Sequence, residues 1–183
     1  MDQPNPTTPQ ASGDEPLNIF SHCHDGILKQ LKTMGDLPEL VAAAERARKV
    51  AEDTRNFFRD VIYNHHEEEE RVLFEAVLAS ATEGDELAHV KAICDRLTRE
   101  HRVVESMFVK LEPDLKKMAK GQPCHLDLAA IEQLVSQYSA HATFEENEFL
   151  PLSHSILSRN SNHMAALGLS LHVRHVSLDA SPT

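Results

Sequence analysis

Residues 64–74 read NHHEEEERVLF, a stretch in which two histidines precede four glutamates and a short apolar run. His65 and Glu69 lie four residues apart, so in an α-helix they project from the same face, one above the other. Residues 141–151, HATFEENEFLP, repeat this His-x-x-x-Glu spacing. Two such helices, each with a histidine and a glutamate on an apolar face, predict a polar site inside a helical bundle.

The composition of the 183-residue chain is typical of one globular, helical domain. Hydrophobic residues make up 41% and charged residues 26%, which argues against a disordered chain. The middle of the chain is rich in Ala, Leu, Glu, Lys and Arg, which favour helix. The net charge of -11 argues against nucleic acid and anionic membranes as partners, because both attract a basic surface.

The three cysteines, Cys23, Cys94 and Cys124, are scattered and form no C-x-x-C pair. We expect reduced thiols and a cytoplasmic protein. The chain has no apolar run of membrane-spanning length, and its acidic, proline-rich beginning is unlike a signal peptide.

Breaker residues divide the chain into helical segments. We expect a disordered tail at 1–16, a four-helix domain at 17–152 and an extension with a short helix at 153–183. The expected main helices span about 17–34, 36–81, 85–120 and 126–150, with the short helix between 160 and 175. Pro113 should kink or interrupt the third helix, and Pro151 should end the fourth.

The second helical segment is too long for one straight helix if its histidine meets the one on the first helix. Counted from their shared turn, His24 lies about 16 Å along the first helix and His65 about 40 Å along the second, at 1.5 Å per residue. We therefore predict a separate short helix or a sharp break around residues 48–54.

Each main helix has an apolar stripe with spacings of three and four, and each stripe contains one histidine. These histidines are His24, His65, His101 and His141. The second stripe comprises Phe58, Ile62, His65, Glu69, Val72 and Ala76, the third Leu97, His101, Val104, Phe108, Leu111 and Leu115, and the fourth Ile131, Leu134, Tyr138, His141, Glu145, Phe149 and Leu152. Glu69 and Glu145 follow two of them on the same face, and Glu105 borders a third stripe. A lone histidine in a core is usually satisfied by hydrogen bonds, but four histidines with two buried carboxylates predict a shared metal site.

Imidazole and carboxylate ligands without thiolate suit iron or manganese, and also zinc. Carboxylates that bridge two metals favour a dinuclear centre in a bundle core. His66 borders its stripe, and we retain it as a candidate hydrogen-bond donor to the ligands. Glu67, Glu68 and Glu70 are expected to form a solvated face.

The four motifs together resemble the hemerythrin-like family, the HHE cation-binding domain. The strongest are HHEEEERVLF and HATFEENEFLP, supported by SHCHDGILKQL at 21–31 and EHRVVESMF at 100–108. The resemblance covers about residues 17–152 and implies an all-α, up-down-up-down four-helix bundle. It departs from oxygen-carrying hemerythrins at Glu105, where they have a second histidine, and this moves the likeness toward bacterial HHE domains.

The resemblance implies two non-haem iron ions in an oxo- or hydroxo-bridged centre. The terminal ligands would be His24, His65, His101 and His141, with Glu69 and Glu145 as bridging carboxylates and Glu105 as a further candidate. We expect a protein that binds O₂ or NO or senses redox state, rather than a dedicated enzyme. The alternatives are a di-iron oxidoreductase for NO or peroxide reduction or iron-cluster repair, and a metal-free bundle for protein contacts. The oligomeric state is left open, with a homodimer as the candidate.

Overall fold

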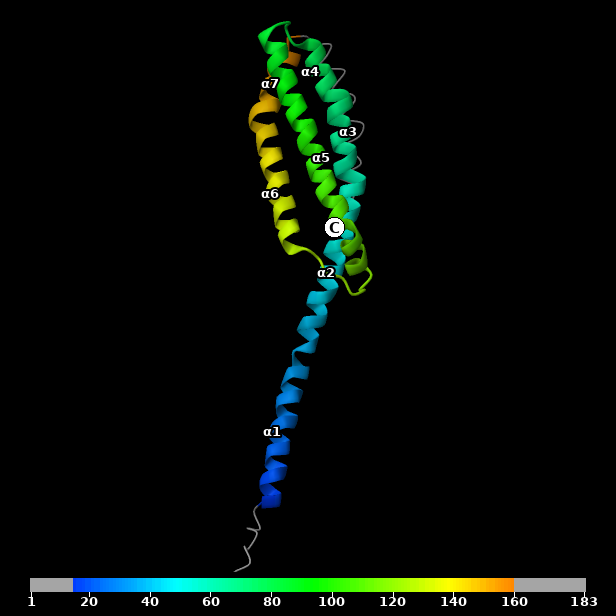
Figure 1. Ribbon diagram of the computed structural model, residues 1–183, viewed down its shortest axis with the longest axis vertical. Coiled ribbons are helices and arrows are strands. Elements are labelled where there is room, and N and C mark those ends of the chain that lie inside the picture. Colours follow the sequence, from blue (N-terminus) through cyan, green and yellow to red (C-terminus); the bar gives the residue numbers. More distant parts are fainter. Residues whose placement is uncertain (1–14, 160–183) are drawn as a thin grey trace, which may run out of the picture. The chain divides into compact units, whose positions relative to one another are not determined.

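The computed structural model describes residues 15–159 of the chain, all of whose regular elements are helices (Figure 1). The expected short helix at 160–175 and nearly all of the expected N-terminal tail lie outside these residues. The chain divides into two compact units, residues 1–47 and 48–183.

The first unit contains α1 (Glu15–Gly35) and the beginning of α2 (Leu37–Phe57). The two helices are joined at Asp36, whose backbone N–H donates to Thr33 O at 3.2 Å. Pro38 lies in the first turn of α2, where its missing N–H leaves no hydrogen bond unmade. The predicted end of the first helix at Gly35 is confirmed.

In the second unit the chain continues as one helical rod to residue 80. After α2 come η1 (Phe58–Ile62), α3 (Tyr63–Glu68), η2 (Glu69–Phe74) and α4 (Glu75–Ser80). The segments η1 and η2 are π-helical, so their hydrogen bonds span five residues instead of four. Each π-helical segment therefore changes which residues face the interior.

The break predicted around residues 48–54 is wrong, because α2 is helical throughout this range. The residues there include neither glycine nor proline, and Lys49 pairs with Asp53 at 3.1 Å, one turn further along the helix. The prediction rested on the premise that His24 and His65 meet, and local helix propensity does not depend on that premise.

The remaining elements are α5 (Asp85–Ala119), α6 (Leu128–Phe144), η3 (Glu145–Phe149) and α7 (Leu150–Leu157). The predicted third helix is confirmed, but Pro113 does not interrupt it. The predicted end at Pro151 is wrong, since the rod continues to Leu157. Pro151 falls in the first turn of α7, directly after the wide turn of η3, where a missing N–H is tolerated.

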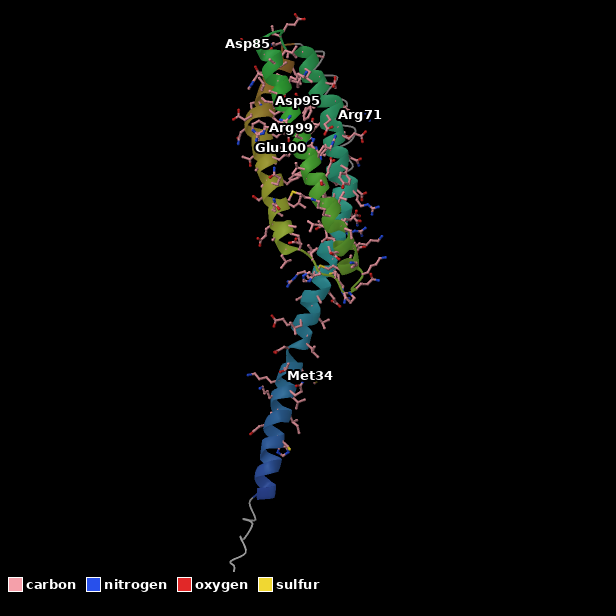
Figure 2. The ribbon with its side chains drawn as sticks, viewed as in Figure 1. Met34, Arg71, Asp85, Asp95, Arg99 and Glu100 are labelled. Atoms are coloured by element: carbon pink, nitrogen blue, oxygen red, sulfur yellow. The ribbon has the colours of Figure 1, made fainter. Side chains whose placement is uncertain are left out.

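Three helical rods of the second unit, residues 48–80, 85–119 and 128–157, lie side by side (Figure 1). Charged side chains such as Arg71, Asp95 and Arg99 project from their outer surfaces (Figure 2). Across residues 15–159, none of the helices is both long and apolar enough to span a membrane.

Two apolar clusters fill the interior of the second unit. The Phe108 cluster comprises Ala51, Phe58, Ile62, Val104, Phe108, Leu111, Leu115 and Leu134. The Phe149 cluster comprises Phe74, Val77, Val90, Ile93, Cys94, Leu97, Phe149, Ile156 and Leu157. On α5, the buried His101 lies between Leu97 of one cluster and Val104 of the other. A polar layer therefore separates the two apolar clusters at the level of His101.

The N-terminus of α6 is capped by Asp127, whose Oδ1 accepts a hydrogen bond from Ala130 N at 3.0 Å. We expect Asp127→Ala to lower the free energy of unfolding by about 1 kcal/mol, because an orphan helix donor loses its acceptor. Urea unfolding measures the change. Asp127→Asn retains a capping oxygen and should behave like the unmodified protein; equal losses in both variants would contradict the capping role.

Candidate metal centre

The first rod turns His66, rather than His65, toward the interior. His66 is 1% exposed, whereas the side chain of His65 is 42% exposed. A helix with regular 3.6-residue turns would place His65 below Ile62, as the sequence stripe predicted. The π-helical segment η1 precedes these histidines and adds a residue to its turn, so the buried position falls at His66.

Three buried histidines converge from three different elements. His66 comes from α3, His101 from α5 and His141 from α6, and ligand atoms of all three lie within 4.8 Å of one another. The rings of His66 and His101 stack at 3.9 Å between centroids, and His141 meets His101 edge-on at 4.8 Å. This arrangement is the first of two groups with the spacing of metal ligands.

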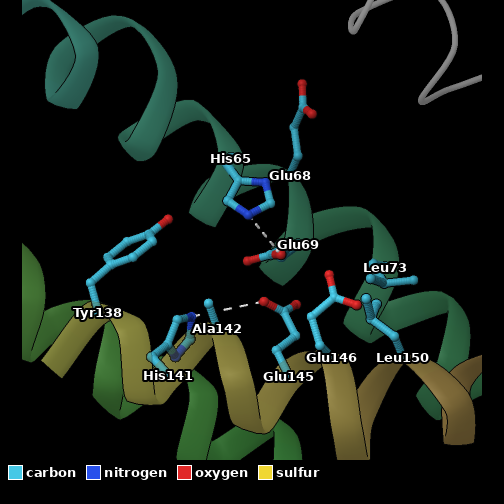
Figure 3. Close-up of a pocket in the computed structure, with 10 residues that line it drawn as sticks. All are labelled: His65, Glu68, Glu69, Leu73, Tyr138, His141, Ala142, Glu145, Glu146 and Leu150. Atoms are coloured by element: carbon cyan, nitrogen blue, oxygen red, sulfur yellow. Dashed lines mark ion pairs between the residues drawn. The ribbon is translucent and has the colours of Figure 1, made fainter. Parts of the chain in front are cut away.

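The second group is formed by His65, Glu69 and Glu145, whose ligand atoms also lie within 4.8 Å of one another. His65 Nε2 lies 3.1 Å from Glu69 Oε1. Figure 3 shows Glu69 on one rod facing His141 and Glu145 on the other. A cavity of about 260 Å³ lies between these side chains, with Tyr138 among its lining residues.

The two groups are adjacent, because His101 Nε2 lies 3.3 Å from Glu69 Oε2. Glu69 therefore stands between the three histidines on one side and His65 with Glu145 on the other. A carboxylate in this position has one oxygen available to each group, which is the arrangement that a bridging ligand requires.

Each histidine of the first group is hydrogen-bonded through Nδ1 to a glutamate on a neighbouring rod. His66 pairs with Glu105 at 2.9 Å, His101 with Glu70 at 2.8 Å and His141 with Glu100 at 3.0 Å. A carboxylate that accepts from Nδ1–H selects the tautomer whose Nε2 has a free lone pair, as metal-binding histidines require.

Several inward-facing polar atoms are fully buried and make no hydrogen bond of good geometry, although His101 Nε2 and Glu69 Oε2 face each other at 3.3 Å. They are Nε2 of His66, Nε2 of His101, Oε2 of Glu69 and Oε1 of Glu145. Leaving buried polar atoms unpaired is unfavourable, and native proteins rarely do so without a reason. A cation between the two groups would satisfy all four atoms at once. The donor set of imidazoles and carboxylates suits iron, manganese or zinc.

The two buried carboxyl groups of the site share one proton in the absence of a cation. Burial raises the pKa of Glu145 to about 9, and the hydrogen bond to Glu69 and its charge act in the same direction. Burial also opposes ionisation of Glu69, but hydrogen bonds with His101 and Glu145 prevail and its pKa lies below the usual value. Two carboxylates at such short range cannot both ionise, so Glu145 holds the proton.

The pKa values of the three buried histidines shift in different directions. Burial lowers the pKa of His66 to about 4 despite its bond to Glu105, and burial likewise lowers the pKa of His141. Burial also disfavours the charged form of His101, but Glu69 and Glu70 outweigh it and its pKa is raised. Neutral His66 and His141 have their lone pairs available at neutral pH, which favours cation binding.

The structure brings together most of the residues that the sequence singled out. His65, Glu69, His101, His141 and Glu145 all belong to one of the two groups. Glu105 is outside both groups and instead supports His66. His24 lies on α1 in the first unit, so its role as a ligand stays a prediction.

Sequence reasoning missed three contributors to the site. His66 was placed only at the border of its stripe, and Glu70 was assigned to a solvated face, which is wrong because it binds the His101 ring. The third is Glu100, which supports His141. The available signal was the spacing: Glu70 follows His66 by four residues, as Glu105 follows His101.

Comparisons with known proteins agree with this geometry. A family model described as the hemerythrin HHE cation binding domain matches residues 15–153. A protein of Haemophilus influenzae, described as an uncharacterized protein, is 23% identical over 163 residues, which cover 85% of this chain and 91% of that protein. No solved structure matches significantly.

Proposed function

The chain belongs to the hemerythrin HHE cation binding domain family, and from this premise we propose that it is a di-iron protein that binds O₂ or NO. The observation that carries the proposal is the pair of adjacent ligand groups, with four buried polar atoms between them that make no hydrogen bond of good geometry. One iron would lie among His66, His101 and His141, and the other among His65, Glu69 and Glu145.

The position of Glu69 supports a dinuclear centre rather than two independent sites. Its two oxygens are 3.1 Å from His65 Nε2 and 3.3 Å from His101 Nε2, so each oxygen faces one group. Glu145 would complete the bridge after losing its proton to the entering cations. Following the family motif, we further propose that the complete fold is a four-helix bundle and that His24 is a ligand.

The surroundings of the site favour ligand binding over unselective chemistry. Bound iron would supply open coordination positions and a reversible redox change. Apolar side chains of the Phe108 and Phe149 clusters flank the polar layer, so bulk water has little access along the bundle. The cavity beside Glu69 and Glu145 is large enough for a diatomic molecule and is lined in part by Leu73 and Leu150.

The proposal also includes a cytoplasmic location, where iron(II) and reduced thiols persist. The three cysteines are free thiols in the described structure. A homodimer remains the proposed oligomer.

Anaerobic purification after iron(II) reconstitution tests the metal proposal directly. We expect about two iron ions per chain from the two ligand groups, and a near-ultraviolet absorption band after oxidation. Less than one iron per chain without such a band would refute it. Exposure to O₂ or NO then separates the functions: a reversible spectral change without consumption indicates binding, whereas sustained consumption indicates an oxidoreductase.

A further inference from the structure

Two histidine–glutamate pairs cross between the first rod and α5. His66 of the first rod binds Glu105 of α5, while His101 of α5 binds Glu70 of the first rod. The glutamate one turn after each histidine thus supports the histidine of the other rod, not its own. The two imidazoles are stacked with an interplanar angle of 6°, so each pair fixes a ring that packs against the other.

A single cation joins the outer ends of these two pairs. Arg102 Nη2 donates to Glu70 Oε2 at 2.5 Å, and Arg102 Nη1 donates to Glu105 Oε1 and Oε2 at 3.1 and 3.0 Å. Each carboxylate therefore binds a histidine on its inner side and the same guanidinium on its outer side. The planar fork of an arginine is suited to two carboxylates at once.

We propose that Arg102 is the positioning residue of the metal centre: through Glu70 and Glu105 it holds His101 and His66 with both Nε2 atoms directed at a shared cation. This inference rests on the proposed function. Arg102 touches neither imidazole and acts through the carboxylates.

Arg102 holds the two carboxylates in place through its positive charge. Glu70 and Glu105 are partly exposed, at 19% and 21% of their side chains, so each can rotate into solvent. Two neighbouring carboxylates repel each other unless a cation lies between them. Without Arg102 we expect them to separate and to release the Nδ1–H groups of both histidines, whose rings then sample both tautomers.

His141 provides an internal control, because its support is separate. Its Nδ1 is bound by Glu100, and Arg96 Nε donates to the other oxygen of Glu100 at 2.7 Å. Within the described residues, Arg102 hydrogen-bonds to neither Glu100 nor His141. Loss of Arg102 should therefore disturb His66 and His101 far more than His141, an effect that a general loss of stability would not produce.

The first test is long-range ¹H–¹⁵N NMR of the histidine rings in the full-length, metal-free protein at one pH near 8. In Arg102→Ala we expect the ring-nitrogen shifts of His66 and His101 to move toward mixed tautomers, while those of His141, which only packs against His101, move much less. Arg71→Ala is the matched control, since exposed Arg71 pairs with Glu67, which hydrogen-bonds to none of the histidines among the described residues. Unchanged shifts in Arg102→Ala, or equal changes at His141, would refute the positioning role of Arg102.

The second test is titration of the same proteins with Co²⁺ against a competing chelator. Arg102→Ala should weaken binding about ten-fold, the lower end of the loss that is usual when the carboxylate partner of a metal-binding histidine is removed. Arg102→Lys should be intermediate, because an ammonium group lacks the fork that spans both carboxylates. Affinity within two-fold of the unmodified protein would overturn the proposal. Failure of the unmodified protein to bind Co²⁺ would instead refute the proposed function. The NMR result would still show whether Arg102 positions the two histidines.

Discussion

His101→Ala should reduce the affinity for iron(II) by about 100-fold or more, a larger effect than loss of a supporting residue. His101 is fully buried, stacks on His66 and lies 3.3 Å from Glu69. It is therefore the histidine through which the two ligand groups meet. Its removal takes away one ligand and also the ring against which His66 is packed. Anaerobic equilibrium titration with a chromophoric chelator measures the loss.

The matched control for this variant is His89→Ala, because His89 lies on the same helix and is exposed. It should bind iron like the unmodified protein. Circular dichroism of both metal-free variants separates a lost ligand from a lost fold, since α5 should remain helical in each. Equal iron affinities of the two variants would place the metal centre elsewhere.

Helix type and the facing residues of α5 and α6 were predictable from the sequence. The stripe from Leu97 through His101 to Leu115 is buried as predicted, because α5 keeps regular α-helical spacing over the whole stretch. In the fourth stripe Leu134, His141, Glu145 and Phe149 are buried, whereas Ile131, Tyr138 and Leu152 are half-buried. In a regular α-helix the spacing of residues in the sequence determines which of them share a face. The predicted faces of these helices therefore agree with the structure.

The first rod was predicted less well, because its spacing changes at η1 and η2. A pattern of three and four residues assumes 3.6 residues per turn, and each π-helical segment shifts the buried face onward. His66 therefore replaces His65 in the interior, and Phe74 and Val77 replace Val72 and Ala76 as the buried residues. The local amino-acid composition does not predict a π-helical turn.

The supporting glutamates could not be assigned, for a different reason. Glu70, Glu100 and Glu105 act on histidines of neighbouring rods, so their roles depend on which faces meet. Sequence spacing reports contacts within one helix and not contacts between helices. Within its own helix, Glu70 lies beside the stripe, so its spacing alone resembles that of a surface residue.

Glu145→Gln should stabilise the metal-free protein at neutral pH while weakening its binding of iron. A glutamine has the shape of a protonated glutamate and can donate the same hydrogen bond to Glu69, but it never ionises. Since the pKa of Glu145 is raised to about 9 in the folded protein, the folded state binds a proton that the unfolded chain releases near pH 4.5. The free energy of unfolding should therefore fall as pH rises between these values, by up to about 1.4 kcal/mol per pH unit.

The pH dependence of the free energy of unfolding tests whether Glu145 holds the shared proton. Stability from the protonated Glu145 is complete below its unfolded pKa and is lost as pH rises through about 9. Urea unfolding of metal-free protein from pH 7 to 9 should show this decline in the unmodified protein and in Glu148→Gln, whose side chain is exposed. In Glu145→Gln the decline should be much shallower, with a gain on the order of 3 kcal/mol at pH 7. Parallel curves in all three proteins would contradict the shared proton. Iron binding should fall only in Glu145→Gln, because a cation exchanges for that proton and an amide offers it no negative charge.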